Sequence, residues 1–115
     1  MKKLLLILMF ACFFSANAQT ENPNYDSKLA ESLGGNEYGM KMYVLAILKT
    51  GSNKVEDKEK LNELFRGHME NINRLAKEGK LVVAGPLGKN DKNYRGIFIL
   101  NVKTIEEANQ LLNTD

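Results

Sequence analysis

The chain has 115 residues, with 16 lysines and arginines against 14 aspartates and glutamates, and a formal charge of +2. This length allows one domain and excludes a full barrel of alternating strands and helices, or a dinucleotide domain joined to a substrate domain. Two of the lysines lie in a predicted leader, and without it 14 basic residues balance 14 acidic ones. Nucleic acid is therefore not an expected partner, because phosphate binding needs a surplus of lysine and arginine.

Residues 1–18 have the three parts of a secretory signal peptide. Two lysines precede an unbroken apolar run from Leu4 to Phe14, and Ala16-Asn17-Ala18 follows. We predict cleavage after Ala18 and an exported protein, periplasmic or secreted, with no membrane contact after the leader is removed. The alternative is an anchor helix, but the run is shorter than the roughly 20 residues that span a bilayer. Cys12 is the only cysteine, so the mature chain has no disulfide and no thiolate ligand.

Residues 19–40 predict a polar arm with one short helix, capped by Asp26 and ended by Gly34. The domain proper is expected from residue 41 to residue 115. It begins with a continuous apolar run from Tyr43 to Leu48, which predicts a strand buried on both faces or nearly so.

The next segment predicts a long amphipathic helix from near Asp57 to Gly79, where glycine offers a left-handed stop. Apolar residues recur at spacings of three and four and so share one stripe of the helix. The only histidine lies on this stripe, which is expected to face inward. Its members are Leu61, Leu64, Phe65, His68, Ile72, Leu75 and Ala76.

A second strand is predicted at residues 81–84, ended by Gly85-Pro86 because proline cannot donate to a strand ladder. After a polar loop, residues 96–102 predict a third strand. Thr104 and Glu107 then form the spacing of a capping box, which opens a final helix through Leu112.

The order strand, helix, strand, strand, helix predicts an α+β domain with most of the ferredoxin-like split βαβ plan. One strand of that plan is missing after Asp115. Either the sequence is a C-terminally incomplete fragment or another chain completes the sheet. We favour the fragment, because an unpaired edge of a buried type of strand invites aggregation.

Four stretches together resemble the YCII-related domain family over residues 40–115. The most specific is residues 67–87, where a helix histidine, a leucine-rich turn, a glycine stop and a small apolar strand lead into Ala84-Gly85-Pro86. The others are the strands at residues 43–48 and 96–100 and the helix start at residues 104–108.

The resemblance implies a dimeric α+β barrel, in which two sheets pack face to face. Members are mostly uncharacterised. A histidine and aspartate pair is proposed as their active site, a phosphohistidine is suggested in some descriptions, and one branch dehydrochlorinates a substituted hydroquinone. The histidine corresponds to His68, and the aspartate corresponds by position to Asp115. The family's aspartate usually precedes a proline, which would lie beyond this sequence.

From the residues alone, His68 has two interpretations: a core histidine bonded to backbone carbonyls, or a general acid and base. An imidazole suits the second because it titrates near neutral pH. With the resemblance, we predict His68 and Asp115 as catalytic residues for proton transfer or elimination, as in a lyase or dehydrochlorinase. The alternative function is a non-catalytic dimeric module for ligand binding or assembly.

Three further residues are candidates for substrate binding. Gly85 and Pro86 are predicted to shape the mouth of a cleft, or simply to end a strand. Tyr94 is predicted to bind an anion or aromatic group together with Arg95, or to lie in a solvated hairpin, while Arg66 is expected to face water. We expect a homodimer with a small-molecule substrate and no cofactor. No metal is expected either, because one histidine and scattered carboxylates give no recognised ligand spacing.

Overall fold

The computed structural model describes residues 22–115, so the predicted leader and its cleavage site lie outside the described residues. The chain divides into two units between Met40 and Lys41. In the first unit, α2 (Ser27–Ser32) begins as predicted, because the Asp26 side chain accepts a hydrogen bond from the Leu29 amide at 3.0 Å. Gly34 follows the helix with a φ of +76°, which glycine adopts without strain.

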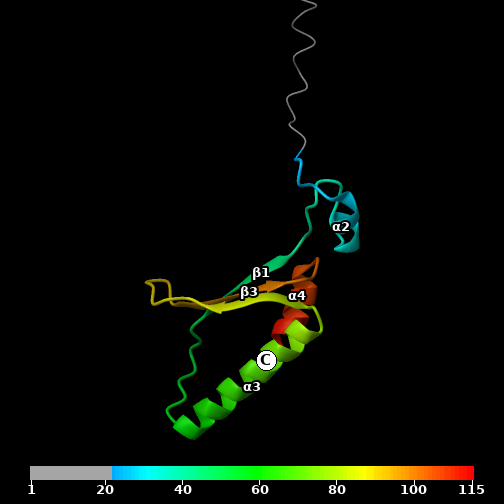
Figure 1. Ribbon diagram of the computed structural model, residues 1–115. Coiled ribbons are helices and arrows are strands. Elements are labelled where there is room, and N and C mark those ends of the chain that lie inside the picture. The colour runs from blue at the N-terminus through cyan, green and yellow to red at the C-terminus, as the bar shows by residue number, and fades with distance from the viewer. Residues whose placement is uncertain (1–21) are drawn as a thin grey trace, which may run out of the picture. The chain divides into compact units, whose positions relative to one another are not determined.

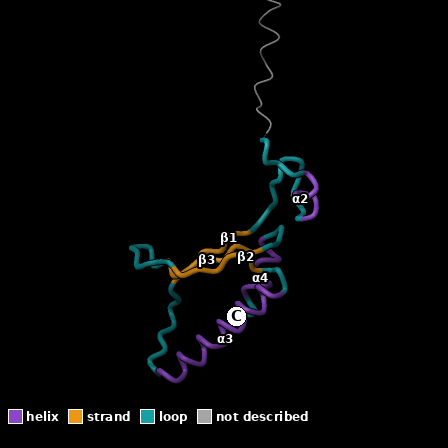
Figure 2. The backbone as a smooth tube through the Cα atoms, in the orientation of Figure 1, coloured by secondary structure: helices purple, strands orange, loops and turns teal. Residues whose placement is uncertain are grey.

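The second unit contains an open antiparallel sheet of three strands in the order β1-β3-β2 (Figures 1 and 2). The strands are β1 (Val44–Lys49), β2 (Leu81–Pro86) and β3 (Tyr94–Leu100). Since β3 pairs antiparallel with both neighbours, β1 and β2 run parallel to each other. They are connected through α3 (Lys58–Lys77), which gives a small α+β fold compatible with the ferredoxin-like prediction.

The two helices of this unit begin where the sequence predicted, each at a capping side chain. Asp57 Oδ1 accepts hydrogen bonds from the amides of Glu59 and Lys60 at 2.9 and 3.3 Å, which starts α3. Thr104 and Glu107 form the predicted capping box at the start of α4 (Ile105–Leu112), with both reciprocal bonds at 3.1 Å. The two bonds satisfy backbone donors that a helix end leaves unpaired.

The core lies between the helices and one face of the sheet, where α3 contacts β2 and α4 contacts β1. Its buried apolar residues are Leu75, Leu81, Phe98, Leu100, Val102 and Ala108. The central strand β3 supplies two of them, so it forms the floor on which both helices pack.

The other face of the sheet is open, which corrects the prediction that the first strand is buried on both faces. Val44, Ala46 and Leu48 pack against the core, whereas Leu45 and Ile47 are 58% and 48% exposed. The physical reason is that successive side chains alternate between faces, and both helices cover the same one.

The inward stripe of α3 is also shorter than predicted. Leu61, Leu64 and Phe65 are exposed, while Ile72 and Leu75 pack into the core. Figure 1 shows the cause: α3 (green) runs obliquely past the sheet, so its first half has no strand beneath it.

Two strand boundaries differ from the prediction. Gly85 and Pro86 belong to β2 rather than ending it, and β3 spans Tyr94–Leu100 instead of residues 96–102. A proline fits here because it lies at the end of an edge strand, where a missing N–H leaves little unpaired.

Candidate active site

His68 lies on α3 at the point where the helix reaches the sheet. Its ring stacks on Phe98 of β3, with the ring centroids 6.1 Å apart and an interplanar angle of 19°. Phe98 is buried, whereas the His68 side chain is 32% exposed. The imidazole therefore rests on an apolar floor and still reaches solvent.

Asp115 follows α4 and meets His68 across 47 positions of sequence. The distance from His68 Nδ1 to Asp115 Oδ2 is 2.5 Å, and the Asp115 side chain is 31% exposed. A carboxylate only accepts hydrogen bonds, so it selects the form of the ring in which Nδ1 carries the proton. In the neutral ring, Nε2 then keeps its lone pair. The ring nitrogen is bonded to a carboxylate, not to the backbone carbonyls that a core histidine would use.

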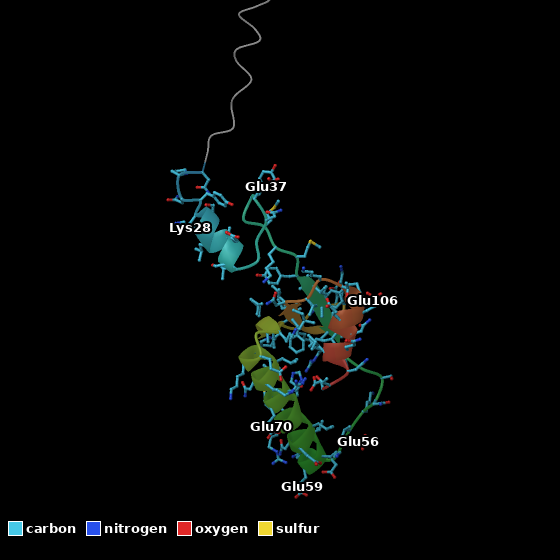
Figure 3. The ribbon with its side chains drawn as sticks, turned by 90° about the vertical axis from the view of Figure 1, so that its right-hand side faces the viewer. Lys28, Glu37, Glu56, Glu59, Glu70 and Glu106 are labelled. Carbon is cyan, nitrogen blue, oxygen red and sulfur yellow. The ribbon has the colours of Figure 1, made fainter. Side chains whose placement is uncertain are left out.

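An open hollow of about 560 Å³ lies beside this pair. It is lined by Lys60, Glu63, Leu64, Arg66, Gly67, His68, Glu70 and Asp115. The lining is mostly charged and comes almost entirely from α3, along which Figure 3 labels Glu59 and Glu70. A Cβ added to Gly67 would meet nothing within 4 Å, so the wall of the hollow is open at this residue.

The charges around the hollow are partly paired. Lys60 Nζ lies 2.8 Å from Glu63 Oε2, and this hydrogen bond, with the charges of Lys60 and then Arg66, lowers the pKa of Glu63. Glu63 therefore stays anionic near neutral pH. Arg66, which was expected to face water, lines this open hollow and adds a second cation to its wall.

The predicted binding residues do not join this hollow within one chain. Gly85 pairs with Ile97, whose side chain lies on the open face of the sheet, and Pro86 pairs with Gly96. Tyr94 lines a different hollow, near Asn90, and Lys49 Nζ lies 5.3 Å from the centre of its ring. Their part in binding stays a prediction.

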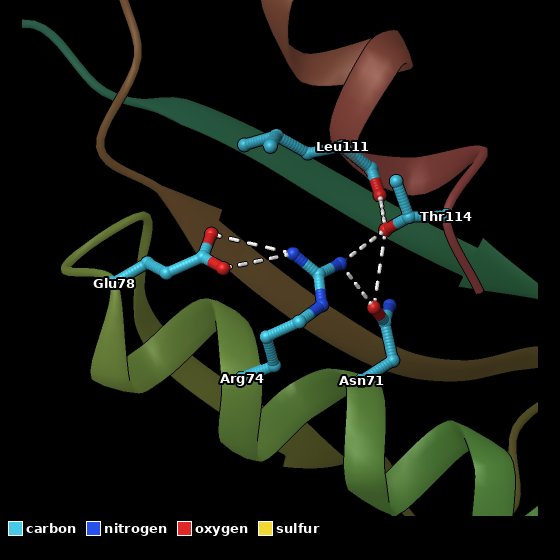
Figure 4. A network of polar contacts seen from close by, with 5 residues as sticks. All are labelled: Asn71, Arg74, Glu78, Leu111 and Thr114. Atoms are coloured by element: carbon cyan, nitrogen blue, oxygen red, sulfur yellow. Dashed lines mark hydrogen bonds and ion pairs between the residues drawn. The ribbon is translucent and has the colours of Figure 1, made fainter.

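A polar network beside the His68–Asp115 pair was not foreseen (Figure 4). Arg74 Nη2 donates to Asn71 Oδ1 at 2.6 Å and to Thr114 Oγ1 at 2.9 Å. Arg74 Nη1 is paired with Glu78 at 3.1 Å. The available signal was Asn71, which lies three residues after His68 and four before Leu75, and so on the buried side of the helix.

The part of the chain that the structure describes offers no cluster of three or more histidine, cysteine, aspartate or glutamate side chains able to hold a metal ion. None of the helices within residues 22–115 is long and apolar enough to cross a membrane.

The fold and the site define a small α+β domain that sets a histidine and carboxylate pair against the helix-covered face of an open sheet. Residues 42–115 match the model of the YCII-related domain, and this match covers well over half of the chain. The chain therefore belongs to the YCII-related domain family, and the resemblance seen in the sequence is confirmed. The comparisons with curated proteins and with solved structures gave no significant match.

Proposed function

We propose that this chain is an exported YCII-related enzyme in which His68 and Asp115 carry out proton transfer or elimination on a small molecule. The observation that carries the proposal is the 2.5 Å contact between His68 Nδ1 and Asp115 Oδ2 beside an open hollow. Export rests on the signal-peptide pattern of residues 1–18.

In this chemistry, His68 Nε2 is the base. It takes a proton from a substrate carbon, the electron pair of that C–H bond forms a double bond to the neighbouring carbon, and a leaving group departs with its own bonding pair. The imidazolium then returns the proton to water. Asp115 holds the ring in the required tautomer and stabilises its positive charge while the proton is on it.

The hollow favours a small carbonyl or aromatic substrate. Its volume of about 560 Å³ lies within the range of roughly 300–1,000 Å³ that is common for small-molecule sites. Arg66 and Lys60 on its wall are suited to stabilise negative charge on an oxygen as the proton leaves the neighbouring carbon. The stacked Phe98 ring keeps one side of the imidazole away from water.

We also propose that the chain forms a homodimer through the open face of its sheet. Leu45 pairs with Ile99, and Ile99 pairs with Val83, so these three side chains form an apolar row across the open face. Leu45 and Val83 are 58% and 41% exposed in the single chain. An uncovered apolar sheet face is stabilised when a partner covers it.

This same face favours a second candidate function, a non-catalytic module for ligand binding or assembly. In that case His68 only packs, and its replacement destabilises the domain. A small-molecule site would then be absent, so no compound in a metabolite library would raise the melting temperature.

The test is a thermal-shift screen against metabolites, followed by turnover assays on the compounds that bind. His68→Gln should lower the rate by about 10²- to 10⁴-fold, the usual contribution of a positioned base, while the fold is kept. Thr104→Val serves as a control, since it lies at the far end of α4 from Asp115. Turnover that survives in His68→Gln would rule out the proposed chemistry.

A further inference from the structure

The backbone of the turn that carries Asp115 is held by long hydrogen bonds. After α4 ends, the Thr114 amide donates to the Leu111 carbonyl at 3.2 Å, and the Asp115 amide donates to the Leu112 carbonyl at 3.4 Å. Both are long for N–H···O bonds, whose usual distance is about 2.9–3.0 Å. The position of the Asp115 carboxylate therefore depends on what holds its neighbour, Thr114.

The side chain of Thr114 is held by the Leu111 carbonyl of α4 and by two side chains of α3. Arg74 Nη2 has two hydrogens and donates one to Thr114 Oγ1 and one to Asn71 Oδ1. The hydroxyl of Thr114 has a single proton, for which the Leu111 carbonyl at 2.6 Å and Asn71 Oδ1 at 3.1 Å are both acceptors. Figure 4 shows the Arg74 guanidinium with Glu78 on one side and with Asn71 and Thr114 on the other. One guanidinium nitrogen thus joins α3 to the turn after α4.

Arg74 is itself fixed on the other side. Its Nη1 lies 3.1 and 3.3 Å from the two carboxylate oxygens of Glu78. Asn71 is only 8% exposed, so the bond that it accepts is shielded from water and stronger than a surface bond. Arg74, Asn71 and Thr114 therefore form a clamp with one buried end, and we use that name for these three residues below.

The clamp runs beside the candidate active-site pair. Asn71 is three residues after His68 on the same side of α3, and Thr114 directly precedes Asp115. His68 thus has Asn71 close to it on α3, and Asp115 has Thr114 directly before it in the turn after α4. Any shift of Thr114 relative to Asn71 moves the carboxylate relative to the imidazole.

We propose that the clamp is a positioning device, which holds the Asp115 carboxylate on His68 Nδ1 and so sets the tautomer of the ring. This rests on the proposed function. None of the three clamp residues lines the hollow, so the clamp acts through Asp115 rather than on a substrate.

The test uses the fact that His68 is the only histidine of the chain. Labelling histidine with ¹⁵N gives one pair of ring signals, whose chemical shifts distinguish the Nδ1–H tautomer from the Nε2–H tautomer when the ring is neutral. The wild-type chain should show mainly Nδ1–H. Thr114→Val, which replaces the hydroxyl by a methyl group, should shift the ring toward the Nε2–H form that free histidine favours, and Thr114→Ser should restore Nδ1–H. Arg74→Met, which keeps the apolar stem, should act like Thr114→Val.

Two controls separate the clamp from the proposed function and from stability. Asp115→Ala removes the acceptor and so tests the pair itself: if it leaves the tautomer unchanged, the His68–Asp115 contact does not set the ring and the proposed function fails. If Asp115→Ala changes the tautomer but Thr114→Val and Arg74→Met do not, only the clamp is refuted. Thr104→Val makes the same hydroxyl-to-methyl change at the other end of α4. Thr104→Val should lower the melting temperature without changing the tautomer. If it changed the tautomer as much as Thr114→Val does, the effect would come from lower overall stability, and the clamp would be refuted.

Discussion

Replacement of His68 by glutamine should cost little stability, and this separates a working histidine from a packed one. Two interactions are lost. The contact with Asp115 joins side chains that are 32% and 31% exposed, and partly solvated pairs contribute up to about 1 kcal/mol. Stacking on Phe98 at 6.1 Å contributes about 0.5–1.5 kcal/mol. We expect the free energy of unfolding to fall by about 1–2 kcal/mol.

Urea denaturation followed by circular dichroism measures this change. With a slope of about 1 kcal/mol per molar urea for a small domain, the midpoint should fall by about 1–2 M. Leu100→Ala gives the scale for a buried residue, because Leu100 is fully buried and its truncation should cost about 2–5 kcal/mol. A loss for His68→Gln as large as that of Leu100→Ala would refute the argument and favour the packed histidine of the assembly module.

Three further outcomes are expected. Thr104→Ala should lower the free energy of unfolding by about 1 kcal/mol in thermal melts, since it removes an N-cap; no change would mean that the capping box does not hold α4. The amides of Lys103 and then Thr104 lower the pKa of Glu107 from 4.5, so its contribution to stability is complete above that value and is lost as the pH falls through the folded pKa. Glu107→Gln should therefore weaken the pH dependence of the melting temperature in acid, and an unchanged profile would contradict this. Ile47→Asp on the open face should convert a dimer to a monomer in sedimentation, whereas a wild-type chain that is already monomeric at micromolar concentration would refute the proposed dimer.

Features governed by neighbouring residues could be predicted from the sequence. Asp57 and Thr104 begin their helices because each side chain bonds to amides two or three residues away. Gly79 follows α3 with a φ of +69°, as expected for a left-handed stop. Such bonds depend on spacing along the chain and need no knowledge of the fold.

Features governed by the layers of the fold could not be predicted in this way. Periodicity placed Leu61 and Phe65 on the apolar stripe, but their exposure depends on how far α3 extends past the sheet. Burial of the first strand was overestimated for a similar reason, because a run of apolar residues does not reveal which faces are covered. The link from Asn71 to Thr114 spans 43 positions and becomes visible only when α3 and α4 are side by side.

The approach of His68 and Asp115 was predicted from the family resemblance rather than from spacing. The periodic pattern located the histidine on a helix face, but nothing local pointed to its partner. The capped start of α4 explains how the chain returns to α3. The eight residues of α4 lead to the turn in which Asp115 contacts His68 of α3.

The central strand β3 serves two surfaces with alternate residues. Phe98 supports the imidazole on the helix-covered face of the sheet, whereas Ile97 and Ile99 lie on the open face. Even-numbered residues of this strand therefore serve one surface and odd-numbered residues the other. Insertion or deletion of a single residue within β3 would exchange the two sets. A substitution there changes one of the two surfaces, whereas a change of length would remove the support of the histidine and alter the opposite surface in the same event.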